Sequence, residues 1–263
     1  MAQTMLPANT FAGQVAVITG GGTGIGFGIA SMLAQLGAKV VLASRNPEHL
    51  HAAEERLRAE HRSVFSVPTD VRQPEAVDGL FDRVLAELGQ VDILINAAAG
   101  NFIADTEKLS VNGWNSVVQS VLNGTFYCSR RAGLAMIKVG RGGKILSVVA
   151  SYAWTGGPRT VHSVAAKAGV VALTRSLAVE WAAHGIRVNA VCPGPTDTEG
   201  ARPLWQDSEA RTRILAKIPV GRFGTVEEVA QAATYLVSPY ADFINGEVLV
   251  IDGGEWLGKG LTS

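Results

Sequence analysis

Three glycines near the N-terminus have the spacing of a phosphate-binding loop. Gly20, Gly24 and Gly26 follow the apolar run Val15–Thr19 and precede a segment with helical periodicity. Glycine permits a tight turn and lets backbone amides approach a pyrophosphate at the helix N-terminus. We therefore expect a dinucleotide to bind at this loop, held by Gly20, Thr23, Gly24, Ile25 and Gly26.

The residues that end the second predicted strand indicate which dinucleotide binds. Ser44 and Arg45 stand where an NAD-preferring site usually has an acidic residue for the ribose diol. A cation at this position can pair with a 2′-phosphate, so Ser44 and Arg45 predict NADPH as the cofactor. The alternative is a solvated arginine at the end of a strand.

A second pair of polar residues lies on a predicted helix in the second half of the chain. Ser163 and Lys167 are one helical turn apart, so both side chains lie on the same face. The serine can hydrogen-bond a substrate, a water or a ribose. It is not expected to be a nucleophile, because no Ser–His–Asp arrangement is evident and His162 is only its sequence neighbour. We expect His162 to serve in packing or polar lining.

Apolar, β-branched runs alternate along the chain with longer segments of helical periodicity. The strands are expected at Val15–Thr19, Lys39–Ala43, Ser63–Val67, Val91–Asn96, Gly143–Val149, Arg187–Val191 and Glu247–Ile251. The helices are expected at Ile25–Leu36, Pro47–Glu60, Pro74–Leu88, Asn112–Val139, Val161–His184 and Thr225–Val237. This alternation predicts an α/β fold, a Rossmann-type doubly wound parallel sheet of about seven strands with helices on both faces.

The chain is expected to form one dinucleotide-binding and catalytic domain over residues 1–263. Residues 1–12 form a short N-terminal extension in this prediction. The segment 193–218 follows a strand and clusters Pro, Gly, Thr and Arg. Such an irregular segment is typical of a cover over a site, so we expect it to cover the substrate.

Composition excludes several classes of protein. With 47% hydrophobic and 17% charged residues, the chain is a folded globular protein, and its net charge of zero argues against a nucleic-acid binder. Cys128 and Cys192 are too few for a disulfide framework or a metal site, and they are expected in the core. No apolar stretch reaches membrane-spanning length, and residues 1–12 lack a signal or transit pattern. We therefore expect no membrane partner, no metal and a cytoplasmic location.

The motifs together resemble the short-chain dehydrogenase/reductase family from about Gly13 to Gly254. The matching residues are Thr19-Gly20-x3-Gly24-x-Gly26, Asn96-Ala97-Ala98-Ala99-Gly100, Asn123, Lys167, Arg187-Val188-Asn189, Pro193-Gly194 and Asp252-Gly253-Gly254. Two departures are equally specific. Ser163 stands where this family usually has its catalytic tyrosine, and Ala150 stands where it usually has a serine. Ordinary carbonyl reduction is therefore not expected from Ser163, because an alkanol is far less acidic than a phenol.

One subgroup, the NADPH-dependent 2,4-dienoyl-CoA reductases, is similar to this chain at these positions. The similarity rests on Ala98-Ala99-Gly100-Asn101-Phe102, Val121-Leu122-Asn123-Gly124-Thr125, Tyr152-Ala153-x-Thr155-Gly156, Ser163-x3-Lys167, Pro193-Gly194-Pro195, Gly221-Arg222-Phe223-Gly224 and Ile244-Asn245-Gly246. The resemblance implies reduction of a 2,4-dienoyl-CoA to a 3-enoyl-CoA in unsaturated fatty acid β-oxidation, by hydride addition at C5 and protonation at C2. It also implies an acyl-CoA partner and a homotetramer.

The resemblance also implies roles for individual residues. Tyr152 and Asn101 would donate hydrogen bonds to the thioester oxygen, Lys167 would bind the nicotinamide ribose, and Asn123 would hold a water near the lysine. The remaining cofactor contacts are expected from Asp70, Val71, Asn96, Ala97, Ala98, Pro193, Gly194 and Thr196. Structural alternatives remain open: an amphipathic ring for Tyr152, a loop-holding amide for Asn101 and a helix-shaping role for Asn123.

Two other functions are compatible with these residues. One is a 2-enoyl-CoA reductase, or another short-chain reductase in which Tyr152 replaces the usual donor. The other is an inactive NADP(H)-binding sensor or scaffold. The joint presence of Asn101, Tyr152 and Lys167 weakens this last interpretation, because a decayed site need not retain such groups.

Overall fold

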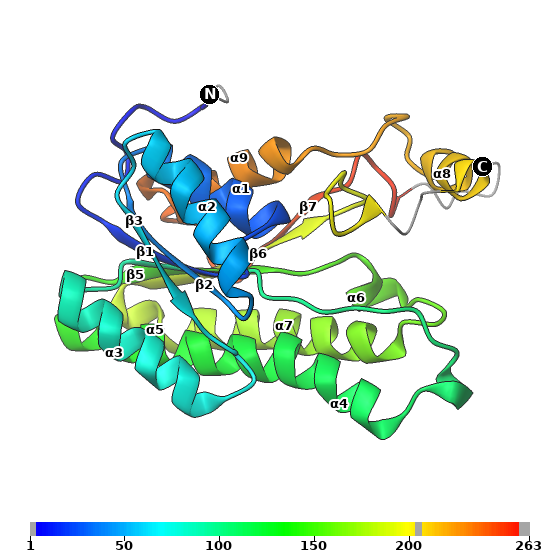
Figure 1. Ribbon diagram of the computed structural model, residues 1–263, viewed down its shortest axis with the longest axis horizontal. Helices are drawn as coiled ribbons and strands as arrows, with labels where there is room; N and C mark the ends of the chain where they lie inside the picture. Colours follow the sequence, from blue (N-terminus) through cyan, green and yellow to red (C-terminus); the bar gives the residue numbers. More distant parts are fainter. Residues whose placement is uncertain (1–3, 203–206, 258–263) are drawn as a thin grey trace.

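The computed structural model of the protein describes residues 4–202 and 207–257. Its seven strands form one parallel sheet in the order β3-β2-β1-β4-β5-β6-β7, which confirms the predicted fold class (Figure 1). The strand order changes direction between β1 and β4, so the carboxyl ends of these two strands flank a crevice. The strands are β1 (Val15–Thr19), β2 (Lys39–Ser44), β3 (Val64–Pro68), β4 (Ile93–Asn96), β5 (Gly143–Val148), β6 (Ile186–Pro193) and β7 (Val248–Ile251).

Helices cover both faces of the sheet. Figure 1 shows α1, α2 and α9 over one face and α3, α4, α5 and α7 over the other. Two further helices, α6 and α8, lie near the carboxyl ends of the strands. The bounds are α1 (Gly24–Gln35), α2 (Pro47–Ala59), α3 (Pro74–Leu88), α4 (Val111–Val118), α5 (Gly124–Val139), α6 (Tyr152–Thr155), α7 (Val161–Glu180), α8 (Ser208–Leu215) and α9 (Val226–Val237).

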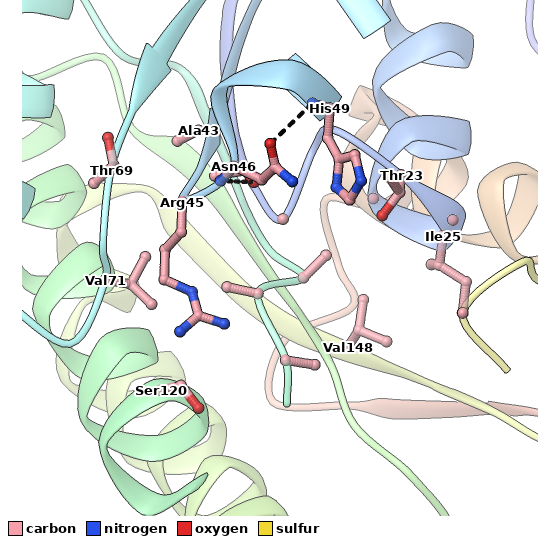
Figure 2. Close-up of a pocket in the computed structure, with 18 of the residues that line it drawn as sticks. Thr23, Ile25, Ala43, Arg45, Asn46, His49, Thr69, Val71, Ser120 and Val148 are labelled. Atoms are coloured by element: carbon pink, nitrogen blue, oxygen red, sulfur yellow. Dashed lines mark hydrogen bonds between the residues drawn. The ribbon is translucent and has the colours of Figure 1, made fainter. Parts of the chain in front are cut away.

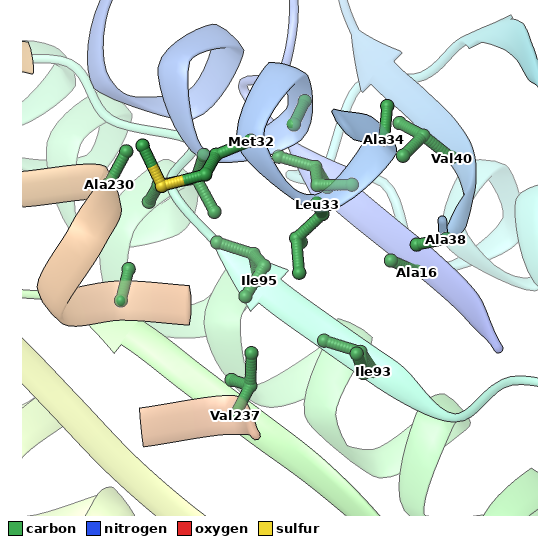
Figure 3. Packing of buried hydrophobic residues seen from close by; sticks show 14 of the residues in the cluster. Ala16, Met32, Leu33, Ala34, Ala38, Val40, Ile93, Ile95, Ala230 and Val237 are labelled. Atoms are coloured by element: carbon green, nitrogen blue, oxygen red, sulfur yellow. The ribbon is translucent and has the colours of Figure 1, made fainter. Parts of the chain in front are cut away.

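The central strands are apolar on both faces because each face packs against helices. On the face of α1 and α9, Leu33 packs over Ile95 of β4 and Met32 lies beside Ala230 of α9 (Figure 3). Gly28 brings α1 and α9 together, since a Cβ there would lie 2.1 Å from Val226 Cγ1. A second cluster fills the opposite face under α3, α5 and α7. The two layers fix the strand ends that carry the site.

The long helix expected over Asn112–Val139 is interrupted. A π-helical turn, Gln119–Asn123, separates α4 from α5. Two hydroxyl groups in and beside this turn donate to the carbonyl four residues earlier: Ser120 Oγ to Ser116 O at 2.9 Å and Thr125 Oγ1 to Val121 O at 2.6 Å. The prediction of one uninterrupted helix was wrong, and Asn123 ends the π turn.

Three other expectations need adjustment. The helix expected to reach His184 ends at Glu180, and a short 3-10 turn follows over Ala182–His184. The sequence patterns missed α6, which has four residues, and α8, which begins at an Asp207 N-cap. The expected extension, from residue 4 onward, packs on the core: Phe11 is fully buried and its N–H donates to Leu36 O.

Candidate active site

The first cavity, of about 460 Å³, opens at the carboxyl ends of β1, β2, β3 and β4 (Figure 2). Most of the predicted cofactor residues meet there: the glycine loop, Ser44, Arg45, Asp70, Val71, Ala97 and Ala98. The sequence patterns missed other lining residues, although Val148 ends β5 and Thr69 directly follows β3. These are Ala43, Asn46, His49, Thr69, Ala99, Ser120, Val148, Thr198 and Gly200.

The glycine loop leaves its backbone open to a ligand. Gly20 and Gly24 have φ angles of 66° and 53°, in the left-handed region that favours glycine. A Cβ on Gly26 would lie 2.2 Å from Gly20 O, so this residue lets α1 approach the loop. A Cβ on Gly24 would meet only Thr198, at 3.8 Å, so this glycine faces open space. The loop fits a pyrophosphate at the N-terminus of α1.

The far end of this cavity carries a cation. Arg45 is exposed, and Figure 2 shows its guanidinium reaching into the cavity towards Val71 and Ser120. Asn46 accepts from the N–H groups of Glu48 and His49 and caps α2, so it is already engaged. The arrangement fits a ribose that carries a 2′-phosphate.

The acidic residue at this end is already paired. Arg72 Nη2 lies 2.6 Å from Asp70 Oδ2, and the Arg72 guanidinium and backbone hydrogen bonds lower the pKa of Asp70, against a smaller opposing effect of burial. Asp70 remains an ionised wall of the cavity. It does not occupy the end of β2, where an NAD-binding acid is expected.

A second cavity, of about 450 Å³, adjoins the first and shares Ile25, Val148 and Thr198 with it. It brings together residues from widely separated segments. The predicted site residues that line it are Asn101, Tyr152, Pro193, Gly194 and Thr196. Apolar side chains on and near α8 contribute Ala201 and Ile214, and Lys217 and Glu255 also line the cavity.

Tyr152 is the phenol of this second cavity. Its hydroxyl lies 3.0 Å from Ser163 Oγ, so the residue in the position of the usual family tyrosine touches the candidate donor. Burial raises the pKa of Tyr152, while the hydrogen bond with Ser163 acts in the opposite direction. The phenol therefore keeps its proton at neutral pH and can donate it.

Lys167 is buried one turn beyond Ser163 along α7, and neither of these two residues is among those lining either cavity. Its Nζ donates to Val148 O at 2.5 Å, and burial lowers its pKa to about 8. Ala150, in the position of the usual family serine, lines the second cavity. The buried ammonium is thus held at the carbonyl of a residue that both cavities share.

Three other residues are placed away from the cavities. Asn96 is not among the residues lining either cavity: its Nδ2 donates to Ser129 Oγ at 3.0 Å and ties β4 to α5. Asn123 is half-buried in the π turn and also lines neither cavity. His162 is fully buried and its ring centroid lies 4.4 Å from that of Phe102, in agreement with a packing role.

Two features are absent from the part of the chain that the structure describes. Within 4–202 and 207–257, no group of three or more His, Cys, Asp or Glu side chains is placed to bind a metal ion. Over the same ranges, no helix has the length and apolar character required to span a membrane.

Known proteins with similar sequences include several reductases. A family model described as enoyl-(acyl carrier protein) reductase matches residues 20–255. A Bacillus subtilis protein named "Probable 2,4-dienoyl-CoA reductase [(2E)-enoyl-CoA-producing]" is 44% identical over 93% of this chain and 97% of its own length. The peroxisomal 2,4-dienoyl-CoA reductase [(3E)-enoyl-CoA-producing] of Pongo abelii is 42% identical over 93% of this chain and 84% of its own.

Solved structures also match. A short chain dehydrogenase from Bacillus anthracis has 45% identity and a TM-score of 0.85, covering 92% of this chain and 96% of that one. A structure from Beutenbergia cavernae with bound NADP has 34% identity and a TM-score of 0.90, covering 96% of this chain and all of that one (100%). The fold, the glycine loop and these similarities lead to one conclusion: this chain is an oxidoreductase of the short-chain dehydrogenase/reductase family, homologous to 2,4-dienoyl-CoA reductases.

Proposed function

We propose that this protein reduces 2,4-dienoyl-CoA thioesters to 3-enoyl-CoA with NADPH, in the β-oxidation of unsaturated fatty acids. One observation carries the proposal: the Tyr152 phenol, hydrogen-bonded to Ser163, lines the same cavity as Asn101, next to the dinucleotide cavity. The residues that a ketone reductase uses are replaced at Ser163 and Ala150, whereas two hydrogen-bond donors for an oxyanion are present.

Conjugate reduction makes a specific demand on the protein. When a hydride adds to C5 of the acyl group, negative charge develops on the thioester oxygen, several bonds away from C5. Donors aimed at this oxygen stabilise the dienolate in a site that excludes water. Asn101 offers an amide N–H and Tyr152 offers a phenolic O–H. An acid that protonates the oxygen of a reduced carbonyl group is not required, so the family tyrosine can be absent.

The proton for C2 can come from the same phenol. Tyr152 is protonated at neutral pH, and when it hydrogen-bonds the thioester oxygen its proton lies closer to C2 than to C4. Ser163 stabilises the developing phenolate by donating its own hydroxyl proton in a hydrogen bond at 3.0 Å. The buried cation of Lys167 adds positive charge nearby.

Bound NADPH would supply the hydride that this reduction requires. Arg45 and Ser44 would hold the 2′-phosphate, the glycine loop the pyrophosphate, and Lys167 the nicotinamide ribose. Thr196 is held in place by its hydroxyl donating to Gly194 O at 3.0 Å, and it would present the backbone of 194–196 to the nicotinamide amide. Asp70 and Val71 would flank the adenine.

The proposal specifies the position of the double bond that remains in the product. The name of the Bacillus subtilis relative specifies a (2E)-enoyl product and that of the Pongo abelii relative a (3E)-enoyl product. Protonation at C2 gives the 3-enoyl thioester, and protonation at C4 gives the 2-enoyl thioester. If Tyr152 hydrogen-bonds the thioester oxygen, as proposed, protonation at C2 is favoured, because C2 is bonded to the thioester carbon and C4 is two bonds further away.

The experiment is a parallel assay followed by product analysis. Purified protein and NADPH are mixed with 2,4-hexadienoyl-CoA, with 2-hexenoyl-CoA or with a 3-ketoacyl-CoA, and NADPH loss is followed. Rapid oxidation with the dienoyl thioester alone, with a 3-hexenoyl product by NMR in deuterated water, is the expected result. Turnover of 2-hexenoyl-CoA instead supports the 2-enoyl reductase. NADPH binding without any turnover supports a binding protein.

The oligomeric state of the protein, its cellular location and the covering role of the segment 193–218 are also proposed. A homotetramer is supported by half-exposed apolar side chains on α5, such as Phe126 and Leu134, and size-exclusion chromatography with light scattering tests it. A cytoplasmic location is tested by fractionation of the source cells. The segment 193–218 is proposed to cover the acyl chain, because Ala201 and Ile214 line the second cavity; its residues 203–206 lie outside the described part.

A further inference from the structure

The chain turns sharply after β7, over residues 252–257, which we call the Asp252 turn. The Asp252 carboxylate accepts from Gly254 N and from Trp256 N, both at 2.8 Å, so one side chain fixes the turn from within. Glu255 from this turn lines the second cavity. The turn therefore forms a rigid part of the cavity wall.

Two neighbouring segments hold the Asp252 turn in place. On one side a Cβ on Gly194 would lie 2.7 Å from Asp252 Cα, so the turn packs directly on the backbone that lines the second cavity. On the other side Val220 N donates to Gly253 O at 3.2 Å, just beyond α8. A Cβ on Gly253 would also lie 3.0 Å from Ile218 Cγ2, so the turn packs against both ends of the segment 193–218, at Gly194 and at Ile218.

A third contact reaches the donor residue. The ring of Trp256 lies against that of Trp154, with centroids 5.8 Å apart and an interplanar angle of 37°. Trp154 belongs to α6, the four-residue helix that begins at Tyr152. Aromatic pairs at such separations are attractive beyond their buried area.

The α6 helix needs support from outside because it is short and ends at a glycine. Gly156 has a φ of 71°, and the helix closes with one turn, in which Gly156 N donates to Tyr152 O at 3.0 Å. From the α7 side, Ser163 holds the Tyr152 hydroxyl. From the opposite side, the Trp154–Trp256 contact holds the backbone two residues further on.

We propose that Trp256 is a positioning residue for the reduction: through Trp154 it holds the turn that carries Tyr152 at the distance from the Asp252 turn that an acyl thioester requires. This inference rests on the proposed function. It adds to the proposed site a residue, Trp256, that is about a hundred positions from Tyr152 in the sequence. A donor displaced by about 1 Å can cost as much as a hundredfold in rate, so a modest shift of α6 is enough to matter.

The test compares Trp256→Ala, Trp256→Phe, Trp154→Ala and the double variant with the wild type. We expect Trp256→Ala to lower kcat for 2,4-hexadienoyl-CoA by about tenfold and to raise its KM, with the Kd of NADPH unchanged. Trp256→Phe should retain most of the activity, because a ring still contacts Trp154. The double variant should be no worse than either single variant, since both remove the same contact.

Tyr240→Ala is the matched control. Tyr240 is an exposed aromatic in the 3-10 turn Pro239–Ala241, outside both cavities, and its loss should leave kcat and KM unchanged. Circular dichroism and thermal melting establish that each variant folds. A kcat and KM for Trp256→Ala within twofold of wild type, or effects of the two tryptophans that multiply, would overturn the proposal.

A readout that needs no turnover separates this proposal from the proposed function. The ionisation of Tyr152 is followed by tyrosinate absorbance, as the difference from the same protein with Tyr152→Phe. In the wild type burial raises the pKa of this phenol. Trp256→Ala should bring that pKa back towards its ordinary value as α6 loosens, even if no thioester is turned over. An unchanged Tyr152 titration in Trp256→Ala contradicts the positioning role, and absent turnover with a shifted titration contradicts only the proposed reaction.

Discussion

The two adjoining cavities differ in the kind of groups that line them. The cofactor cavity is formed mostly by backbone and small side chains at the ends of β1 to β4, all fixed by the central core. The second cavity is formed by side chains from segments as far apart as Asn101 and Glu255. Among the residues that the structure describes, its cover packs on a small cluster with two buried members, Ile218 and Phe223, and partly buried neighbours.

This difference shows how one scaffold can change its chemistry. The glycine loop binds its ligand with backbone groups that every residue has. Dinucleotide binding is therefore retained as long as the glycines of the loop are retained. The second cavity depends on a few side chains, and there Ser163 and Ala150 replace the usual residues while Tyr152 offers the phenol. The variants below alter one cavity at a time.

The largest effect is expected for Tyr152→Phe. Removing one oxyanion donor costs about 10²- to 10³-fold in kcat. The Kd of NADPH should not change, because Tyr152 lies outside the first cavity. Steady-state kinetics and fluorescence titration measure the two quantities, with Tyr240→Phe as the control. A kcat within about threefold of wild type would show that another group is the donor.

Arg45→Ala should affect the opposite cavity. A charge-assisted hydrogen bond is worth about 1.5–3 kcal/mol, so the Kd of NADPH should rise about 10- to 100-fold while that of NADH stays the same. Arg58→Ala is the control, since Arg58 lies on α2 and pairs with Glu54 away from the cavity. Equal weakening for both dinucleotides would mean that Arg45 does not recognise the 2′-phosphate.

Raising the pH should remove the charge of Lys167. Its pKa is lowered to about 8 by burial, so kcat/KM, which reports on the free enzyme, should fall by about tenfold per pH unit above that value. Stability changes in the other direction. The folded protein releases this proton before the unfolded chain does, so the contribution of Lys167 to stability rises between pH 8 and the ordinary lysine value of 10.5.

The pH effect is checked by comparing activity and thermal melting across this range. In Lys167→Arg, whose side chain stays charged, the alkaline fall in kcat/KM should disappear. A fall that persists unchanged in that variant would assign the titration to another group.

The smallest effect is expected for Ile214→Ala in α8. This half-buried side chain lines the second cavity, and losing part of an apolar contact worth about 1 kcal/mol should raise the KM for the dienoyl thioester about three- to tenfold. Leu215→Ala is the matched control, because Leu215 packs on the same small cluster and does not line the cavity. Equal changes in both variants would mean that the effect is on folding of the cover.

The sequence predicts the first cavity better than the second for a physical reason. Glycine spacing after an apolar strand is a local pattern, and every predicted loop residue lines the cofactor cavity. The inward orientation of Asn96 depends on strand register, and its partner Ser129 lies 33 residues away. The contact of Tyr152 with Ser163 and that of Trp154 with Trp256 arise only when separate elements pack.

The same contrast holds for the fold. All seven strands and the helices α1, α2, α3, α7 and α9 were predicted, with shifts of a few residues at their ends, whereas α4 and α5 were predicted as one helix. The four-residue α6 is too short to show a period, and hydroxyl–carbonyl bonds do not mark the π turn, since bonds of the same kind occur in the uninterrupted helices α7 and α9.

The π turn also marks where the length of this segment can change. A π turn holds one residue more than the α-helical turn that it replaces, so the residues after it keep the orientation that a regular helix one residue shorter would give them. The buried residues Val117, Val121, Cys128 and Ala132 accordingly continue along one face through Gln119–Asn123. Deleting one residue of the π turn would therefore restore a regular helix and leave Cys128 and Ala132 in the core, whereas a deletion within α5 would rotate the residues on one side of it by about 100°.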